Sequence, residues 1–251
     1  MTELNNNVLF CGYNKTGQHW ILFFVMNYHN ILMNKAEETV DWKIIGKFGR
    51  VKDGVINLAP NQSYLTGFPR MMWTEYSRSQ SVRVRDWFDS FDKLFYLHRH
   101  PGDVMISMFH YFIKPKIFEK VKKIDLKTSE YFHEYVKNNI PKYFTHIEQT
   151  IDYADFALCY DVLRKDPSDF KKVVRLFYDD VDELVFQKAL KFSSFENVDA
   201  LWTEERLKEL DMVRHTRDGR SGQYKERMNI ELIEWIKEES KKRGLYKLWE
   251  W

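Results

Sequence analysis

The strongest constraint on the fold is the alternation of short apolar runs with segments of helical periodicity. Four runs have the length and composition of buried strands: 8–11, 71–73, 94–97 and 156–160. A helical segment follows the first run at 18–33, and Pro101 is well placed to open another after the third. Buried strands that alternate with helices favour a mainly parallel sheet covered on both faces. We therefore predict one α/β domain over residues 1–251, with such a sheet flanked by helices.

The remaining segments complete this prediction. Glycines at 46, 49, 54 and 67 indicate turns and short strands in the stretch 34–67. Two glycines in 214–224 indicate a loop. Helical periodicity predicts further helices at 129–139, 141–150, 169–178, 181–191 and 229–242.

Composition excludes several classes of function. The formal net charge is +2, from 39 basic and 37 acidic residues, which argues against a nucleic-acid-binding protein. No run approaches the length of a membrane span, and the polar segment 1–7 has no signal-peptide pattern. Cys11 and Cys159 each lie in an apolar run, so we expect free core thiols in a reducing compartment. These features predict a cytoplasmic protein with no nucleic-acid or membrane partner.

The loop between the first strand and helix has the composition of a phosphate-binding turn. It reads Gly12-Tyr13-Asn14-Lys15-Thr16-Gly17. Backbone N–H groups at such a turn point toward an anion, and a lysine adds a positive charge. ATP- and GTP-binding loops place Lys directly after the second Gly, which this loop does not. On its own the loop fits either phosphate binding or an ordinary strand-to-helix turn.

Two later segments also fit an anionic ligand. Arg99 ends a strand, where its guanidinium fork can clamp a phosphate, and Ser107 lies about two turns into the next helix. A buried salt bridge and a plain helix serine would explain these two residues equally well. The segment 214–225 combines two glycines with four arginines or lysines, and is either an anion cradle or a mobile surface loop.

Together and in this order, the three segments resemble the cytosolic PAPS-dependent sulfotransferase family. The first segment, residues 11–20, looks like that family's Tyr-Pro-Lys-Ser-Gly-Thr-Thr-Trp loop for the 5′-phosphosulfate. In this chain it reads Cys-Gly-Tyr-Asn-Lys-Thr-Gly-Gln-His-Trp. Arg99 and Ser107 match its Arg-x-Pro-x-Asp-x-x-x-Ser signature for the 3′-phosphate. Residues 217–225 are similar to its Arg-Lys-Gly-x-x-Gly-Asp-Trp-Lys motif. Tyr160-Asp161-Val162-Leu163 and Ser193-Ser194-Phe195 resemble its two adenine-binding segments.

The resemblance implies a P-loop-like phosphosulfate-binding loop. It also implies PAPS (3′-phosphoadenosine-5′-phosphosulfate) as the cofactor, 3′,5′-adenosine bisphosphate as its product, and no metal. Lys15 and the loop amides are expected to neutralise the leaving phosphate, assisted by Thr16 and Gln18, while Trp20, Tyr160 and Phe195 sandwich adenine. Asp218 replaces a family lysine, and Arg220 can compensate. The expected cofactor residues are Asn14, Lys15, Thr16, Gly17, Gln18, His19, Trp20, Arg99, Ser107, Tyr160, Ser193, Phe195, Arg217, Asp218 and Gly219.

The predicted catalytic residues are Lys15, Glu75 and His19. The family places its catalytic histidine in a Pro-Arg-aliphatic-aliphatic-Lys-Thr-His segment, and the matching segment here, 69–75, ends in Glu75. A partly buried glutamate can take the acceptor proton, and His19 is the alternative base. Because related sulfotransferases that act on nitrogen also use a glutamate, the acceptor is expected to present a hydroxyl or a nitrogen.

The acceptor is expected to be a small molecule, cationic or nitrogen-containing. Aromatic residues make up 16% of the chain, and an aromatic box with the carboxylates of Glu75 and Asp41 suits a cation. The alternative is that most of these aromatics are core. The candidate pocket residues are Tyr28, Trp42, Phe48, Trp73, Tyr76 and Trp87.

Rival interpretations remain at this stage. The histidines at 98, 100 and 110 lack a nearby Asp, Glu or Cys to complete a metal site, so none is predicted. A P-loop nucleotide kinase would need the Gly-Lys-Ser/Thr sequence. An inactive sulfotransferase-like nucleotide-binding protein would explain Glu75 and Asp218. The family's Lys-Thr-Val-Glu dimer motif is not visible, and the sequence leaves the oligomeric state open.

Overall fold

A mainly parallel sheet organises the protein. The computed structural model describes residues 8–33, 50–51, 55–58, 71–74, 88–89, 91–112, 124–200, 203 and 219–251. Within these residues one six-stranded sheet has the order β2-β3-β4-β1-β5-β6. The strands are β1 (Val8–Gly12), β2 (Arg50–Val51), β3 (Val55–Leu58), β4 (Met71–Thr74), β5 (Lys93–His98) and β6 (Phe156–Cys159). β4, β1, β5 and β6 run parallel, while β2 and β3 pair antiparallel at one edge. The prediction of a mainly parallel α/β sheet is confirmed.

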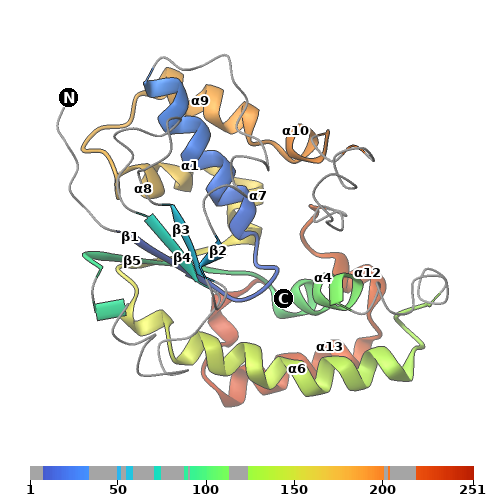
Figure 1. Ribbon diagram of the computed structural model, residues 1–251. Helices are drawn as coiled ribbons and strands as arrows, with labels where there is room; N and C mark the ends of the chain where they lie inside the picture. The colour runs from blue at the N-terminus through green and yellow to red at the C-terminus, as the bar shows by residue number, and fades with distance from the viewer. Residues whose placement is uncertain are drawn as a thin grey trace.

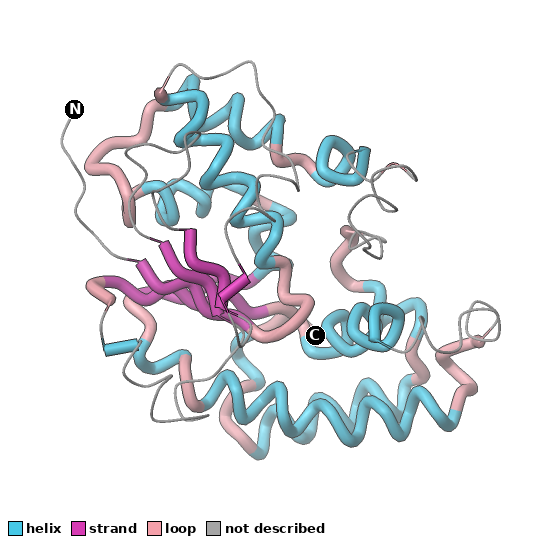
Figure 2. The backbone as a smooth tube through the Cα atoms, viewed as in Figure 1, coloured by secondary structure: helices cyan, strands magenta, loops and turns pink. Residues whose placement is uncertain are grey.

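Helices cover both faces of this sheet, as Figures 1 and 2 show. One face carries α1 (Gln18–Leu32), α8 (Phe170–Val174) and α9 (Glu183–Phe192), and the other carries α4 (Pro101–Phe112), α6 (Glu130–Glu148) and α13 (Ile230–Lys242). The short helices are α7 (Tyr160–Lys165), α10 (Phe195–Ala200) and α12 (Gln223–Arg227), with 3₁₀ turns at Ile151–Tyr153, Pro167–Asp169 and Tyr246–Leu248. None of the described helices is both long and apolar enough to span a membrane.

The side chains of the buried strand β1 pack in two separate hydrophobic cores. Val8 and Phe10 pack in the core beneath α1, whereas Leu9 and Cys11 pack in the core beneath α4 and α6. Successive side chains of a strand point to opposite faces, so both alternating sets must be apolar when both faces are covered. The uninterrupted apolar run at the start of the chain therefore reflects burial on two sides.

Three predicted helix boundaries are wrong. The segments 129–139 and 141–150 form one helix, α6, with Pro141 inside it. The buried side chains Phe132, Val136, Ile140 and Tyr143 lie at helical spacing across the proline, so packing holds the helix together despite the lost hydrogen bond. The predicted helix 169–178 is instead a 3₁₀ turn followed by the short α8. Gln223, predicted in a loop, begins α12.

The parallel strands bring the predicted binding loops to one edge. Gly12 pairs with Leu97, and His98 pairs with Cys159, so β1, β5 and β6 end side by side. Ligands of parallel α/β sheets bind beyond the carboxyl ends of the strands. The loop 13–17, Arg99 and Tyr160 all follow directly from these ends.

Tyr143 of α6 fixes the position of the β5 end. Its buried hydroxyl donates to the carbonyl of Arg99 at 2.7 Å and accepts from the N–H of Arg99 at 3.0 Å. One side chain therefore satisfies both backbone groups of the residue that the sequence predicts to clamp a phosphate.

Replacing Tyr143 by Phe should lower the free energy of unfolding by about 1–3 kcal/mol, because a buried N–H and a buried carbonyl lose their partner. Chemical denaturation measures this change. Tyr131→Phe, on the same helix but 49% exposed, is the matched control and should be neutral. Equal stability of the two variants would contradict the role assigned to the Tyr143 hydroxyl.

Candidate functional site

Side chains of the loop between β1 and α1 and of the first residue of α1 donate hydrogen bonds to the loop's own carbonyls. The Thr16 hydroxyl donates to the carbonyl of Tyr13 at 2.7 Å. The Gln18 amide donates to the carbonyls of Gly12 and Tyr13 at 2.5 and 3.0 Å. Sequence reasoning expected both side chains to assist the leaving phosphate directly, but here their hydrogens are already engaged within the loop. Their position supports a role in shaping the loop instead.

Backbone N–H groups at the start of α1 can meet an anion at this loop. Helix α1 begins after Gly17 without a side-chain cap from any described residue and without an acidic residue in its first turn. Uncapped N–H groups and the helix dipole make such a helix start an anion site. Gly17 has φ 105°, and an added Cβ would lie 2.3 Å from Cδ2 of Tyr160. The residue therefore has to be glycine for the loop to pack against Tyr160.

Lys15 contributes the positive charge of the loop. It adopts the left-handed region with φ 68°, which is uncommon for a residue other than glycine. Its Nζ lies 4.0 Å from the ring centroid of Tyr111 in α4. The Lys15 side chain thus reaches from the loop to α4, the helix that follows β5.

Arg99 is a buried cation with donor capacity to spare. It is 5% exposed, donates from Nη2 to the carbonyl of Arg220 at 2.9 Å, and lies 3.6 Å from a carboxylate oxygen of Asp103. Its Nε is buried and has no hydrogen-bond partner within the described part of the chain. Burial alone would lower the pKa of Arg99, but Tyr160 and Asp103 raise it above its ordinary value. The group therefore stays charged and can pair with a phosphate.

Asp103 joins the segment that follows β5 to the segment 219–225, a role that sequence reasoning missed. Its carboxylate accepts the N–H of Gly222 at 2.7 Å and that of Tyr224 at 3.0 Å. Burial raises its pKa, although Arg99 beside it opposes that shift. The signal was present in the sequence, because Pro101 opens α4 and places Asp103 in the first turn, where carboxylates are favoured.

The expected adenine residues meet around Gly219. The Tyr160 hydroxyl donates to the Gly219 carbonyl at 2.9 Å, and the guanidinium of Arg99 lies 4.4 Å from the Tyr160 ring centroid. Trp20 meets Tyr160 edge-on at 5.5 Å. Phe195 packs so close to Gly219 that an added Cβ would lie 2.4 Å from its ring. The structure thus brings together Trp20, Arg99, Tyr160, Phe195 and Gly219.

Other predicted residues have different surroundings. Ser193 is fully buried, and its hydroxyl donates to the carbonyl of Ala189 at the end of α9, which is a structural role. Ser107 is partly exposed in α4, and Asn14 and His19 are partly exposed at the loop and the first turn of α1.

Tyr28, predicted for the acceptor pocket, is instead a core residue. It is 1% exposed, packs against Phe24 and Tyr178, and accepts the N–H of Asp182 at 2.9 Å. The acceptor role assigned to it is therefore a mistaken prediction, because helix α1 turns this side chain toward α9. Trp73 lies in β4, and its side chain is not described. Asp41, Trp42, Phe48, Glu75, Tyr76, Trp87, Arg217 and Asp218 lie outside the described residues.

The histidines at the end of β5 are neutral. Burial lowers the pKa of His98 to about 4 and that of His100 to about 3.

Over the part of the chain that the structure describes, no three His, Cys, Asp or Glu residues gather in a way that would hold a metal ion.

Comparisons with known proteins identify the family and the fold. A family model described as "Sulfotransferase domain" matches residues 5–243. The chain is also similar to the crystal structure of mouse sulfotransferase SULT7A1 complexed with PAP, with a TM-score of 0.59 and 16% sequence identity. The match covers 95% of this chain and 84% of the mouse chain. No curated protein matches the sequence. At this identity the structural match establishes the fold alone.

Replacing Asp103 by Ala should lower the free energy of unfolding by about 3–5 kcal/mol, because it leaves Arg99 as a buried charge without its carboxylate. The N–H groups of Gly222 and Tyr224 also lose their acceptor. Chemical denaturation measures the effect, and Asp152→Ala at an exposed position is the control. A loss no larger than the control's would mean that Asp103 does not hold the two motifs together.

Proposed function

Because the chain belongs to the sulfotransferase family, we propose that it transfers a sulfuryl group from PAPS to a small-molecule acceptor. The observation that carries the proposal is that three elements predicted to bind anions lie at one edge of the sheet. These are the uncapped start of α1, the buried Arg99 and the loop at Gly219. The similar mouse protein is described as complexed with PAP, the desulfated form of the proposed donor.

The described residues suggest how the donor is held. The amides at the start of α1, together with Lys15, suit its 5′-phosphosulfate. Arg99, with an unpaired Nε in the described structure, suits the 3′-phosphate, assisted by Ser107 and Arg217. Trp20, Tyr160 and Phe195 offer aromatic surface for adenine. A site that pairs the 3′-phosphate with a buried arginine would select PAPS over ordinary adenosine nucleotides.

Sulfuryl transfer is an in-line displacement at sulfur. The bond from sulfur to the leaving phosphate oxygen breaks as a bond to the acceptor oxygen or nitrogen forms, and the acceptor proton passes to a base. Lys15 and the helix amides stabilise the negative charge that grows on the leaving phosphate. As in phosphoryl transfer, positioning and electrostatic stabilisation supply most of the catalysis.

We assign the base role to Glu75, with His19 as the alternative. Strand β4 ends at Thr74, whose register partner is Cys11, so the chain leaves β4 at the same edge as the anion loop. Glu75 is the next residue in the sequence. A carboxylate base and aromatic residues such as Trp73 suit an acceptor that is cationic or contains nitrogen.

The first test is the Lys15→Ala variant. Turnover of PAPS should fall by about 10²–10³-fold, because a preorganised charge at the leaving group is lost. Binding of 3′,5′-adenosine bisphosphate, measured by calorimetry against AMP and ATP, should change far less. Lys137→Ala on the exposed face of α6 is the control. Near-normal turnover in Lys15→Ala would refute the assignment, and a preference for ATP with Mg²⁺ would reopen the kinase alternative.

A second test separates the two candidate bases. Glu75→Gln should reduce turnover by about 10²–10⁴-fold while leaving bisphosphate binding intact, because only proton removal is lost. His19→Ala should then retain most activity. Steady-state rates with PAPS and a panel of amines and amides measure both variants. The reverse pattern would transfer the base role to His19.

A further inference from the structure

His100 connects the three segments that carry predicted cofactor residues, although sequence reasoning gave it no part in donor binding. It directly follows Arg99 at the end of β5, and only 3% of it is exposed. Because the two residues share a planar peptide bond, contacts that fix His100 also limit where Arg99 can lie. The partners of His100 therefore bear on the geometry of the predicted 3′-phosphate site.

Two hydrogen bonds attach His100 to neighbouring helices. Its backbone N–H donates to Oδ2 of Asp161 at 2.7 Å, and Asp161 directly follows Tyr160 at the start of α7. Its ring Nδ1 accepts the N–H of Gly102, in the first turn of α4, at 3.2 Å. Burial lowers the pKa of His100 to about 3, so the ring stays neutral and keeps an acceptor nitrogen at physiological pH. These bonds hold His100 against the starts of α7 and α4.

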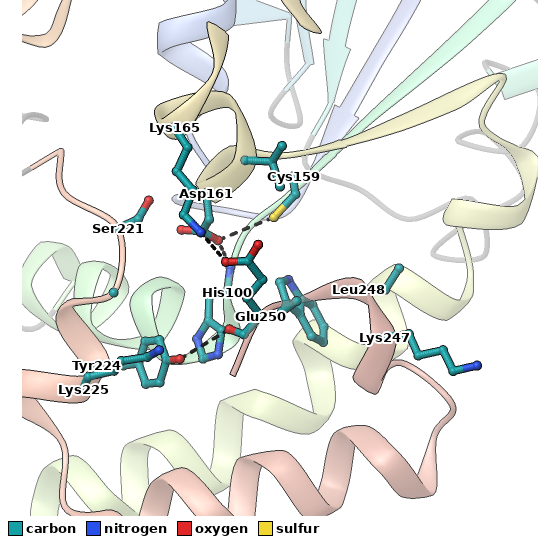
Figure 3. Close-up of a pocket in the computed structure, with 13 residues that line it drawn as sticks. His100, Cys159, Asp161, Lys165, Ser221, Tyr224, Lys225, Lys247, Leu248 and Glu250 are labelled. Atoms are coloured by element: carbon teal, nitrogen blue, oxygen red, sulfur yellow. Dashed lines mark hydrogen bonds and ion pairs between the residues drawn. The ribbon is translucent and has the colours of Figure 1, made fainter.

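The ring of His100 also stacks on Tyr224, the second residue of α12, as Figure 3 shows. The ring centroids are 3.7 Å apart, and the ring planes differ by only 6°. Tyr224 is 3% exposed, and its backbone N–H is bound by Asp103. The segment 219–225 is thus held at its backbone by Asp103 and at a side chain by His100.

This stack helps to set the spacing between the end of β5 and the segment 219–225. Arg99 donates to the carbonyl of Arg220 at 2.9 Å, and Tyr160 donates to the carbonyl of Gly219 at 2.9 Å. Both carbonyls lie within five residues of Tyr224 in the sequence. Loss of the His100 ring would let the start of α12 move relative to β5, which changes the distances that both bonds require.

The segment 246–251 also packs against the ring of His100. Trp251 lies at 4.6 Å between centroids with the planes at 72°, and Trp249 lies at 6.3 Å with the planes at 68°. Trp251 is held in turn by Tyr246, which stacks on it at 5.7 Å and accepts its indole N–H at 3.0 Å through the backbone carbonyl. These aromatic contacts hold the ring in the orientation that its stack requires.

We propose that His100 is a positioning residue of the donor site, and that its stack on Tyr224 couples the segment 219–225 to Arg99. The inference rests on the proposed function, because it concerns the binding of the donor's 3′-phosphate. His100 acts through Arg99 and not by contact with the donor. The two ends of the donor should then differ: binding of the 3′-phosphate depends on the stack, whereas the 5′-phosphate is held at the start of α1.

Calorimetric titration with 3′,5′-adenosine bisphosphate, and with AMP, which lacks the 3′-phosphate, tests the proposal. His100→Asn removes the ring but keeps an acceptor for the N–H of Gly102, and it should weaken bisphosphate binding by about tenfold. AMP binding should change by less than about twofold, because the missing phosphate is the one that depends on Arg99. The preference for the bisphosphate therefore falls. His133→Asn in α6 is the control and should leave both affinities unchanged.

His100→Phe is the conservative variant that should restore binding. Its ring can keep the stack on Tyr224 while the acceptor for Gly102 is lost, so bisphosphate affinity should stay within about threefold of the wild type. From the other side of the stack, Tyr224→Leu should repeat the loss seen in His100→Asn, whereas Tyr224→Phe should not. This second pair tests the stack even if substitution of His100 prevents folding.

Equal weakening of bisphosphate and AMP in His100→Asn would overturn the proposal, because it would make His100 a purely structural residue. A loss in His100→Phe as large as that in His100→Asn would also overturn it, since the stack would not be the coupling contact. Unchanged binding in every variant would refute the role of His100 alone. A wild-type protein that does not bind the bisphosphate would instead refute the proposed function, and this inference with it.

Discussion

The buried carboxylate of Asp103 is the interaction on which the site depends. It accepts two backbone N–H groups at the start of α12 and lies beside Arg99. It therefore holds the segment 219–225 against the segment that follows β5, although more than a hundred residues separate the two in the sequence. A carboxylate in the first turn of α4 is also stabilised by that helix. With Arg99 held in this way, its guanidinium faces Tyr160 and the carbonyl of Arg220. Removal of Asp103 would leave Arg99 as a buried charge without its carboxylate and the start of α12 without this anchor.

Close approach of backbone segments completes this arrangement. Gly102 allows α12 to pack against the start of α4, since an added Cβ would lie 2.6 Å from Cβ of Tyr224. Gly17 and Gly219 play the same part against the rings of Tyr160 and Phe195. These contacts bring aromatic surface, a buried arginine and the start of α1 to one edge of the sheet. Beside that edge, His98 and His100 pack edge-on against Trp249.

The role of a side chain at the loop depends on contacts that spacing does not reveal. Thr16 and Gln18 match positions where a donor to the ligand was expected, yet both donate to loop carbonyls. Tyr28 follows the loop on an apolar helix, and only the docking of α9 shows that it is core. Pro141 suggested a break, but the buried stripe that continues from Val136 to Phe144 keeps α6 whole. In each case a tertiary contact outweighed the local preference.

The sequence by itself determined the strand and helix order, the mainly parallel sheet and the positions of the loops that carry Lys15, Arg99 and Gly219. Those features follow from local periodicity and from glycine and proline placement, which act within a few residues. Only the tertiary structure decided which atoms are paired and which are left free. Asp103 meets Gly222, and Trp249 meets His100, across long separations in the chain. Such pairings depend on how whole elements dock, because burial makes each unpaired polar atom costly only once its neighbours are in place.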